Sequence, residues 1–377
     1  MIPIIDLHCD TILEIWLSRL RGEPISLRDT KSASRPLHID LEKLKEGHYL
    51  LQNFALFTDL HMTMPKGGPA KPDTASWKIP GAGPSSSDAL QSLDTARYVD
   101  PWTQVTQMIR VFREEMEANA DLISQVRNRE DIERNRKSGK ISALLTTEEG
   151  GILQGRIERL DRLYAEGVRM MTVTWNYDNE LGHPNRLPEG CETDYRRFFR
   201  FKPGRDDGLT AFGKDAVCRM QELGILTDVS HLSDGGFYDV ADIVRGPFVA
   251  SHSNARALCG AGRNLTDDMI RIIGDHGGLI GLNFCPSFLM EEDAPEKCYA
   301  SCEAIARHAR HIMGVGGSGV IALGTDFDGI APVNLEIEHA GQIQKLAAFL
   351  EKQGFSASEI EGLCWRNALH VYREVFR

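Results

Sequence analysis

Histidine and carboxylate side chains stand directly after several short apolar runs of the sequence. His8 and Asp10 follow the first run, and His231 and His252 follow two later ones. Imidazole and carboxylate groups are the ligands that Zn²⁺ takes from proteins. A single His-x-Asp string is more often a structural hydrogen-bonded pair. Several such strings that meet at one place instead favour a metal site.

Two further acidic residues stand in the same kind of position. Glu149 follows the third apolar run, and Asp326 follows the last. A glutamate can bridge two cations with its two oxygens, so we expect Glu149 to join the site of His8 to that of the later histidines. Two divalent cations held close together are typical of hydrolases, in which they activate a water and polarise a carbonyl group.

The elements that must position these residues can be predicted from hydrophobic periodicity. Short runs rich in Val, Ile and Leu alternate with amphipathic stretches, which predicts parallel strands that are buried on both faces and covered by helices. We expect a TIM-type (β/α)₈ barrel that forms a single domain over residues 1–377, because catalytic groups of such barrels lie at the carboxyl ends of the strands. An open doubly wound sheet is the alternative. The predicted strands are residues 2–7, 49–58, 141–147, 168–174, 224–229, 247–251, 278–284 and 320–324, and the clearest predicted helices are 157–166, 210–223, 303–313 and 365–376.

Residues 62–100 interrupt this pattern. They are rich in Gly, Pro and Ser, show little periodicity and follow the second predicted strand. An insertion at this point would leave the active-site end of a barrel. We interpret it as a long loop, which is either a lid or pocket wall over the site or a mobile excursion.

Charge and hydropathy exclude some classes of partner. The formal net charge of -11 disfavours binding to nucleic acids and to anionic membranes. The opening MIPIIDLHCD lacks the features of a signal peptide, and no apolar run is long enough for a membrane helix. We therefore expect a cytoplasmic protein that acts on a small molecule and has neither a nucleic-acid nor a membrane partner.

A family resemblance rests on several motifs. They are HCDT at His8, EGG at Glu149, DVSH ending at His231, SHSNARALCGAGRN from Ser251 and GTDFDG around Asp326. Together with GLTAFGKDAV before the fifth predicted strand, they resemble the membrane (renal) dipeptidase family of zinc metallopeptidases, in the amidohydrolase superfamily. The resemblance extends from the first strand to the final helix, and only residues 62–100 match poorly.

The resemblance implies a binuclear zinc dipeptidase that hydrolyses dipeptides by attack of a metal-bridging hydroxide, and it implies a possible homodimer. The implied ligands are His8 and Asp10 for one zinc, His231 and His252 for the other, and Glu149 as the bridge. Asp326 is similar to the family's acid/base, which moves the proton. Arg263 is similar to the arginine that binds the substrate carboxylate.

One position departs from the family pattern. Members such as the renal enzyme have a histidine after the fourth strand that helps to stabilise the tetrahedral intermediate, whereas here the position resembles Trp175 in TVTWNYDNELGHP. An indole has one N–H donor but cannot supply positive charge. We predict that Trp175 shapes the substrate pocket while Asn176 or His183 assists the oxyanion. Direct catalysis by the indole N–H is the alternative.

Other functions remain open at this level. The same fold and metals serve deacylases, lactonases and phosphoester hydrolases, and a non-catalytic metal-binding homologue is a further alternative. His308 and His311 lie far from any predicted strand end. We expect them to be surface or helix-packing residues rather than ligands.

Overall fold

The strands of the protein close into a parallel barrel. The computed structural model describes residues 1–30, 36–65, 96–185, 207–290 and 297–376. The barrel strands follow the order β2-β1-β11-β10-β9-β8-β7-β6, and β6 pairs back with β2, so the sheet has no open edge at this point. They are β1 (Ile4–Asp6), β2 (Tyr49–Phe57), β6 (Ile141–Glu148), β7 (Val168–Thr172), β8 (Leu226–Asp228), β9 (Val249–Ala250), β10 (Leu279–Leu282) and β11 (Ile321–Leu323). The predicted barrel is confirmed, and each of the predicted strands overlaps one of these.

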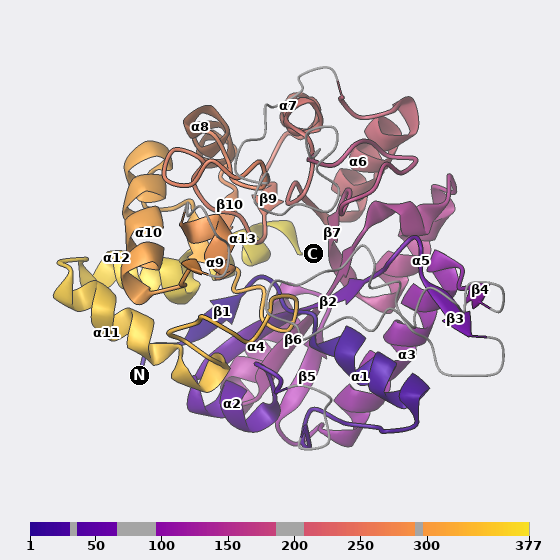
Figure 1. Ribbon diagram of the computed structural model, residues 1–377, viewed down its shortest axis with the longest axis horizontal. Coiled ribbons are helices and arrows are strands. Elements are labelled where there is room, and N and C mark those ends of the chain that lie inside the picture. Colours follow the sequence, from indigo (N-terminus) through magenta and orange to yellow (C-terminus); the bar gives the residue numbers. More distant parts are fainter. Residues whose placement is uncertain (31–35, 66–95, 186–206, 291–296, 377) are drawn as a thin grey trace.

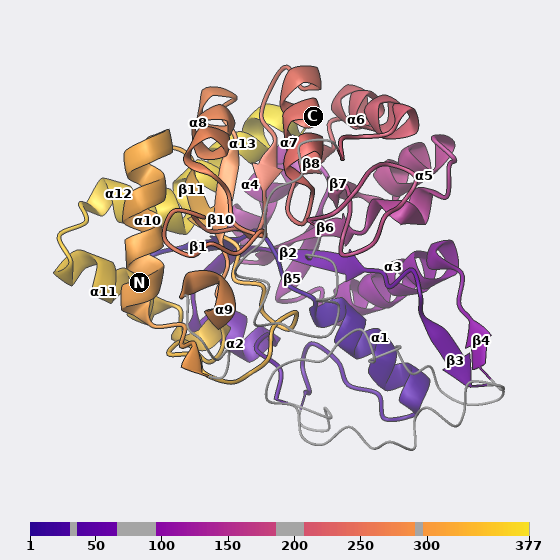
Figure 2. The same cartoon turned by 45° about the horizontal axis from the view of Figure 1, so that its top comes forward.

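Helices surround the strands (Figures 1 and 2). They are α1 (Thr11–Arg21), α2 (Leu41–Glu46), α3 (Pro101–Ala118), α4 (Arg129–Ser138), α5 (Glu158–Glu166), α6 (Ala211–Leu223), α7 (Asp234–Ile243), α8 (Asp267–Asp275), α9 (Pro286–Leu289), α10 (Cys302–Gly316), α11 (Gln344–Lys352), α12 (Ala357–Glu361) and α13 (Asn367–Val375). Several begin at a polar residue whose side chain accepts a backbone N–H of the first turn, as Thr210 does for α6 and Ser301 for α10. None of the described helices combines the length and hydropathy that a membrane crossing requires.

The two faces of the barrel strands build separate cores. Leu144, Met170, Leu226 and Val249 point inward, and α13 packs against this inner core through residues that include Tyr372. Residues of the opposite strand face pack under the surrounding helices. The predicted closing helix over residues 365–376 is therefore the element that packs against the inside of the barrel.

Two regions differ from the sequence prediction. Strand β5 (Ile123–Val126) was not predicted, because its sequence ISQV is short and partly polar; it pairs with the first half of β6. The insertion at residues 62–100 contains β3 (Thr63–Pro65) and β4 (Ala96–Tyr98), which pair antiparallel at its two ends. The rest of the insertion, residues 66–95, lies outside the described part of the chain, so its role as a lid or pocket wall stays a prediction.

Candidate metal centre

Glu148, rather than Glu149, is the glutamate that faces the histidines. Along β6 the side chain of Leu144 lies in the inner core and that of Leu145 in the outer core. Because side chains alternate along a strand, Glu148 shares the inward orientation of Leu144. Strand β6 also continues to Glu148, one residue beyond its predicted end. The structure therefore brings Glu148, and not the predicted Glu149, to the histidines.

The carboxylate of Glu148 lies between two histidine-bearing groups. Its Oε2 is 3.3 Å from His8 Nε2, whereas its Oε1 is 3.1 Å from His231 Nε2 and 3.5 Å from His252 Nε2. Ligand atoms of His8, Asp10 and Glu148 lie within 4.8 Å of one another, and so do those of Glu148, His231 and His252. Glu148 is common to these two groups, and a third group joins His8, His252 and Asp326.

Hydrogen bonds orient the imidazole of His252 for metal binding. Asp228, at the end of β8, accepts hydrogen bonds from both the backbone N–H and the hydroxyl of Ser251. A hydroxyl has one hydrogen, so the Ser251 oxygen accepts a bond from His252 Nδ1, 2.7 Å away. The proton of the imidazole is thereby placed on Nδ1, and the lone pair of Nε2 faces the centre.

His231 is oriented in the same way by a different partner. Its Nδ1 lies 3.0 Å from Asn176 Oδ1, so this nitrogen is the donor and Nε2 carries the lone pair. The Nε2 atoms of His231 and His252 are 3.0 Å apart. Two lone pairs this close to each other and to Glu148 repel unless a cation or a proton lies between them. The donor set therefore fits a divalent cation.

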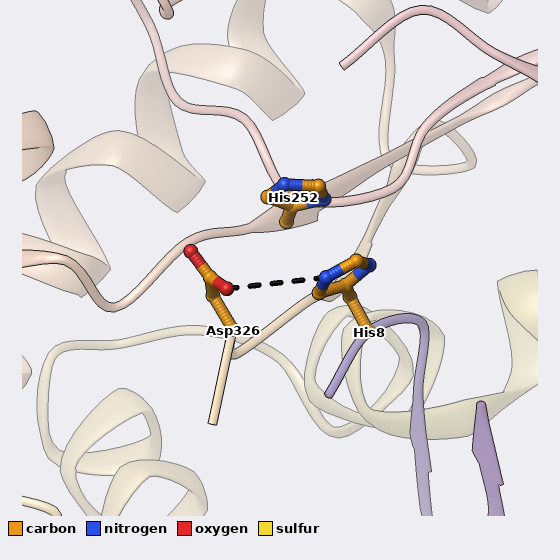
Figure 3. Close-up of side chains that lie close together, drawn as sticks. All are labelled: His8, His252 and Asp326. Atoms are coloured by element: carbon orange, nitrogen blue, oxygen red, sulfur yellow. Dashed lines mark ion pairs between the residues drawn. The ribbon is translucent and has the colours of Figure 1, made fainter. Parts of the chain in front are cut away.

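Asp326, on the turn after β11, faces the same space. Its Oδ1 lies 3.9 Å from His8 Nε2, and Figure 3 shows the carboxylate pointing toward that imidazole, with the His252 ring beside both. Its Oδ2 accepts a hydrogen bond from Asn283 Nδ2 at 2.9 Å. The rings of His8 and His252 stack with centroids 3.9 Å apart. One oxygen of Asp326 is thus held in place while the other faces the centre.

The chain approaches this side of the centre very closely. Thr325 donates hydrogen bonds from its backbone N–H and its hydroxyl to Asp6, which ties β11 to β1. A Cβ atom on Gly329 would lie 2.2 Å from Asp10 Oδ2 and 2.3 Å from Asp326 Oδ1. Only glycine leaves room for the two carboxylates at this position.

The electrostatics of the centre favour bound positive charge. Burial raises the pKa of Glu148 to about 7, although the neighbouring His8 opposes the shift. Burial also lowers the pKa of His8, but the carboxylates of Glu148 and Asp10 outweigh it and raise that pKa well above its ordinary value. Burial holds the pKa values of His231 and His252 well below the ordinary range, so these two imidazoles are neutral, as metal ligands must be.

A comparison with protein families decides the assignment. The family described as membrane dipeptidase, peptidase family M19, matches residues 1–377. The chain belongs to the membrane dipeptidase family. It is therefore a hydrolase of the metallopeptidase class, and the resemblance seen in the motifs is confirmed.

Curated proteins and solved structures are similar over most of this dipeptidase-family chain. An uncharacterized protein in the pqqA 5′ region of Klebsiella pneumoniae is 31% identical over 278 residues, which cover 74% of this chain and 98% of that protein. An uncharacterized dipeptidase of Schizosaccharomyces pombe is 30% identical over 240 residues, 63% of this chain and 54% of that one. A metallopeptidase of Rhodobacter sphaeroides, liganded with a phosphinate mimic of the dipeptide L-Ala-D-Ala, superposes with a TM-score of 0.78 at 24% identity and covers 100% of this chain and 99% of its own. That likeness confirms the fold.

In this family member, Arg263 lies beside the centre and is 4% exposed. Its Nη1 donates to Ser253 Oγ and its Nη2 to the carbonyl oxygen of His252, each at 3.0 Å. Its Nε has no hydrogen-bond partner among the described residues. A guanidinium has five N–H donors, so donors remain after these two bonds.

Trp175 and its neighbours follow β7. The indole packs edge-on against Phe57, with ring centroids 4.7 Å apart, and against Tyr177 at 5.4 Å. Asn176 uses its side-chain oxygen on His231, and His183 lies 2.9 Å from Asp178 through its Nδ1. The structure thus places Trp175 in an aromatic group near His231, whereas the roles of Asn176 and His183 toward an oxyanion stay predictions.

Two histidines outside the centre have structural partners. His308 Nδ1 accepts from the backbone N–H of Ala255, while its Nε2 lies 3.1 Å from the carbonyl oxygen of Leu289. Burial lowers the pKa of His308 to about 4. His311 pairs with Asp267 at 2.7 Å. Both therefore lie among helix contacts, as the sequence predicts.

Sequence reasoning missed three residues of the centre. Glu148 could have been found from its parity with Leu144 along β6. Asp228 stands in the DVSH motif, but its contact with Ser251 depends on the pairing of β8 with β9, and this pairing cannot be read from the sequence. Asn283, the partner of Asp326, follows β10 in the string LNFCP, where an asparagine is unremarkable by type alone.

Proposed function

We propose that this protein is a zinc-dependent dipeptidase with two metal ions per chain. The observation that supports this most is that the two oxygens of Glu148 face different histidine groups, one toward His8 and one toward His231 and His252. Two cations held there would lower the pKa of a water molecule and polarise the scissile carbonyl group. His8, Asp10 and Glu148 would hold one ion, and Glu148, His231 and His252 the other.

Asp326 is the group that moves the proton. Burial raises its pKa to about 7, which lets a carboxyl group both accept and donate a proton near neutral pH. The hydrogen bond from Asn283 fixes one oxygen, so the other can reach first the attacking water and then the leaving nitrogen.

Arg263 binds the free carboxylate of the substrate. Its spare donors suit a carboxylate, and Arg263 interacts electrostatically with Asp326, so the bound carboxylate would lie on the side of the leaving nitrogen. A carboxylate bound there would limit the length of the substrate on the C-terminal side of the scissile bond. The dipeptide mimic bound by the Rhodobacter relative supports a dipeptide as the whole substrate.

The test is turnover of a dipeptide library with the metal content measured on the same sample. We expect two zinc ions per chain and a preference for free over C-terminally amidated dipeptides by about 1.5 to 3 kcal/mol, the usual worth of a hydrogen bond to a charged group. An Arg263→Ala variant should lose this discrimination. Faster turnover of acyl-amino acids, lactones or phosphotriesters would replace the proposal by another hydrolase of the superfamily, and no turnover by fully loaded protein would favour a non-catalytic homologue.

Two wider assignments belong to the same proposal. We place the protein in the cytoplasm and propose a homodimer. Sedimentation of the purified full chain at two concentrations would test the oligomer, and a monomer at both would contradict it.

A further inference from the structure

Glu149 is fully buried beside the centre but does not face it. At this residue the backbone turns with φ 94°, which carries the side chain away from Glu148. Its Oε1 accepts the backbone N–H of Gly151 at 2.6 Å and the side-chain amide of Asn179, and its Oε2 accepts the backbone N–H of Trp175 at 2.9 Å. Two of these three donors belong to the loop that follows β7.

The same loop also contacts a predicted metal ligand, His231. Asn176, next to Trp175, places its Oδ1 3.0 Å from His231 Nδ1. Further along, the backbone N–H of Asn185 donates to the carbonyl oxygen of His231 at 2.7 Å. The loop over residues 175–185 therefore contacts Glu149 at two points, through Trp175 and Asn179, and His231 at two others.

The loop is stiffened between these contacts. Asn179 uses its oxygen to accept the backbone N–H groups of Leu181 and Gly182, at 2.7 and 3.2 Å, and its amide also donates to the carbonyl oxygen of Val173. The side chain of Asn179 thus uses its full hydrogen-bonding capacity on Glu149 and on the backbone of residues 173, 181 and 182. Because these bonds hold the loop firmly, a shift of the loop residues bonded to Glu149 would also move Asn176.

We propose that Glu149 is a positioning residue, which holds the loop so that Asn176 orients the imidazole of His231 toward the cation shared with Glu148. This inference rests on the metal site of the proposed function. Among the described residues, Glu149 is in none of the groups whose donor atoms lie close enough together to hold a metal ion. A carboxylate accepts bonds at both oxygens, and bonds to a charged acceptor are about twice as strong as neutral ones. Glutamine at this place would turn an N–H₂ group toward donors and lose at least one bond.

The experiment measures zinc affinity by competition with a chromophoric chelator, on the full chain and without substrate. The variants are Glu149→Gln, Asn176→Ala and the double variant. Glu180→Gln is the matched control, because Glu180 is an exposed glutamate of the same loop and undergoes the same chemical change. We expect each single variant to weaken one of the two zinc sites by about 10 to 100-fold, the usual loss when a partner of a ligand is removed. The second site and the control should stay at the wild-type affinity.

The double variant separates positioning from general structural support. If Glu149 acts through Asn176, the zinc affinity of the double variant equals that of the single variant with the lower affinity. The reason is that both substitutions remove the same interaction with His231, so their effects do not add. The proposal would be overturned if the double variant lost zinc affinity by the product of the two single losses, or if Glu149→Gln kept the wild-type zinc affinity. If Glu149→Gln does not fold, Glu149→Asp keeps the charge with a shorter reach, and it should show the same selective loss of one site. Dipeptide turnover by the wild type is measured alongside, so that failure of the proposed function is seen separately from the zinc affinities.

Discussion

The two halves of the metal centre are built from different kinds of contact. On one side, His8 and Asp10 follow β1 and Asp326 follows β11, and a Cβ atom at Gly329 would collide with the carboxylates of Asp10 and Asp326. On the other side, His231 donates a hydrogen bond to Asn176 Oδ1, and His252 donates one to Ser251 Oγ, whose hydroxyl donates to Asp228. The first half is fixed mainly by close packing of the backbone, and the second mainly by polar side chains. Added volume should therefore damage the first half, and loss of a hydrogen bond should damage the second.

The largest effect is expected where the halves meet. Glu148→Gln leaves one oxygen to serve two sites, so both zinc ions should be lost together. The kcat/KM for a dipeptide should fall by about 10³-fold or more, which exceeds the loss of about 10 to 100-fold that is typical of an outer partner of a ligand. Elemental analysis of the purified variant checks it. Full occupancy by two metals would contradict a bridging role.

A loss of activity almost as large is expected in a variant that keeps its metal ions. Asp326→Asn keeps the hydrogen bond from Asn283, because an amide oxygen accepts it as well, but the side chain can no longer carry the proton. We expect kcat to fall by about 10² to 10⁴-fold while zinc content and KM stay close to the wild type. Loss of zinc from this variant would show that Asp326 is a ligand, since its atoms also lie near those of His8 and His252.

A volume change should affect the first half alone. In Gly329→Ala the new methyl group would meet Asp10 and Asp326, so we expect the zinc held by His8 and Asp10 to bind about 10 to 100-fold more weakly. The stability of the fold should fall by about 1 to 3 kcal/mol from overpacking. Gly319→Ala is the control, because nothing lies within 4 Å of a Cβ atom there. Equal zinc affinity in the two variants would show that the carboxylates move aside without harm.

The smallest effect is expected at the aromatic group beside the second half. Trp175→Ala removes a side chain that packs on Phe57 and Tyr177 and that we predict to shape the substrate pocket. KM should therefore rise by about 10-fold, which corresponds to about 1.4 kcal/mol of lost contact with the substrate, with a smaller change in kcat. His183→Ala is compared with it to test the oxyanion prediction. If Trp175→Phe loses kcat by about 10²-fold while His183→Ala and Asn176→Ala do not, the indole N–H is itself catalytic.

The fold could be predicted from the sequence because buried parallel strands leave a simple signal. Runs such as residues 279–282 are apolar throughout, and their spacing leaves room for one outer helix each. Strand β5 left no such signal, since Ser124 and Gln125 interrupt its apolar residues. Residues of the centre could be predicted where they directly follow a recognisable strand. His8, His231 and His252 were found for this reason.

The choice between two adjacent glutamates shows where motif reading fails. The EGG string drew the assignment to Glu149, whereas the two-residue period of β6 selects Glu148. The period could have been applied from the sequence, had the strand been extended by one residue. The contacts of Glu149 with Trp175 and Asn179 could not, because they depend on how the loop after β7 folds back.

The pairing of β1 with β11, at Asp6 and Leu323, has a consequence for synthesis on the ribosome. His8 is far from Asp326 and Gly329 along the sequence, so it emerges from the ribosome long before they do. Closing so long a loop is entropically costly and makes such contacts slow to form. We therefore expect that the first half of the centre is completed last and that an emerging chain offers only partial ligand sets. The full metal complement would be acquired only after β11 has emerged and paired with β1.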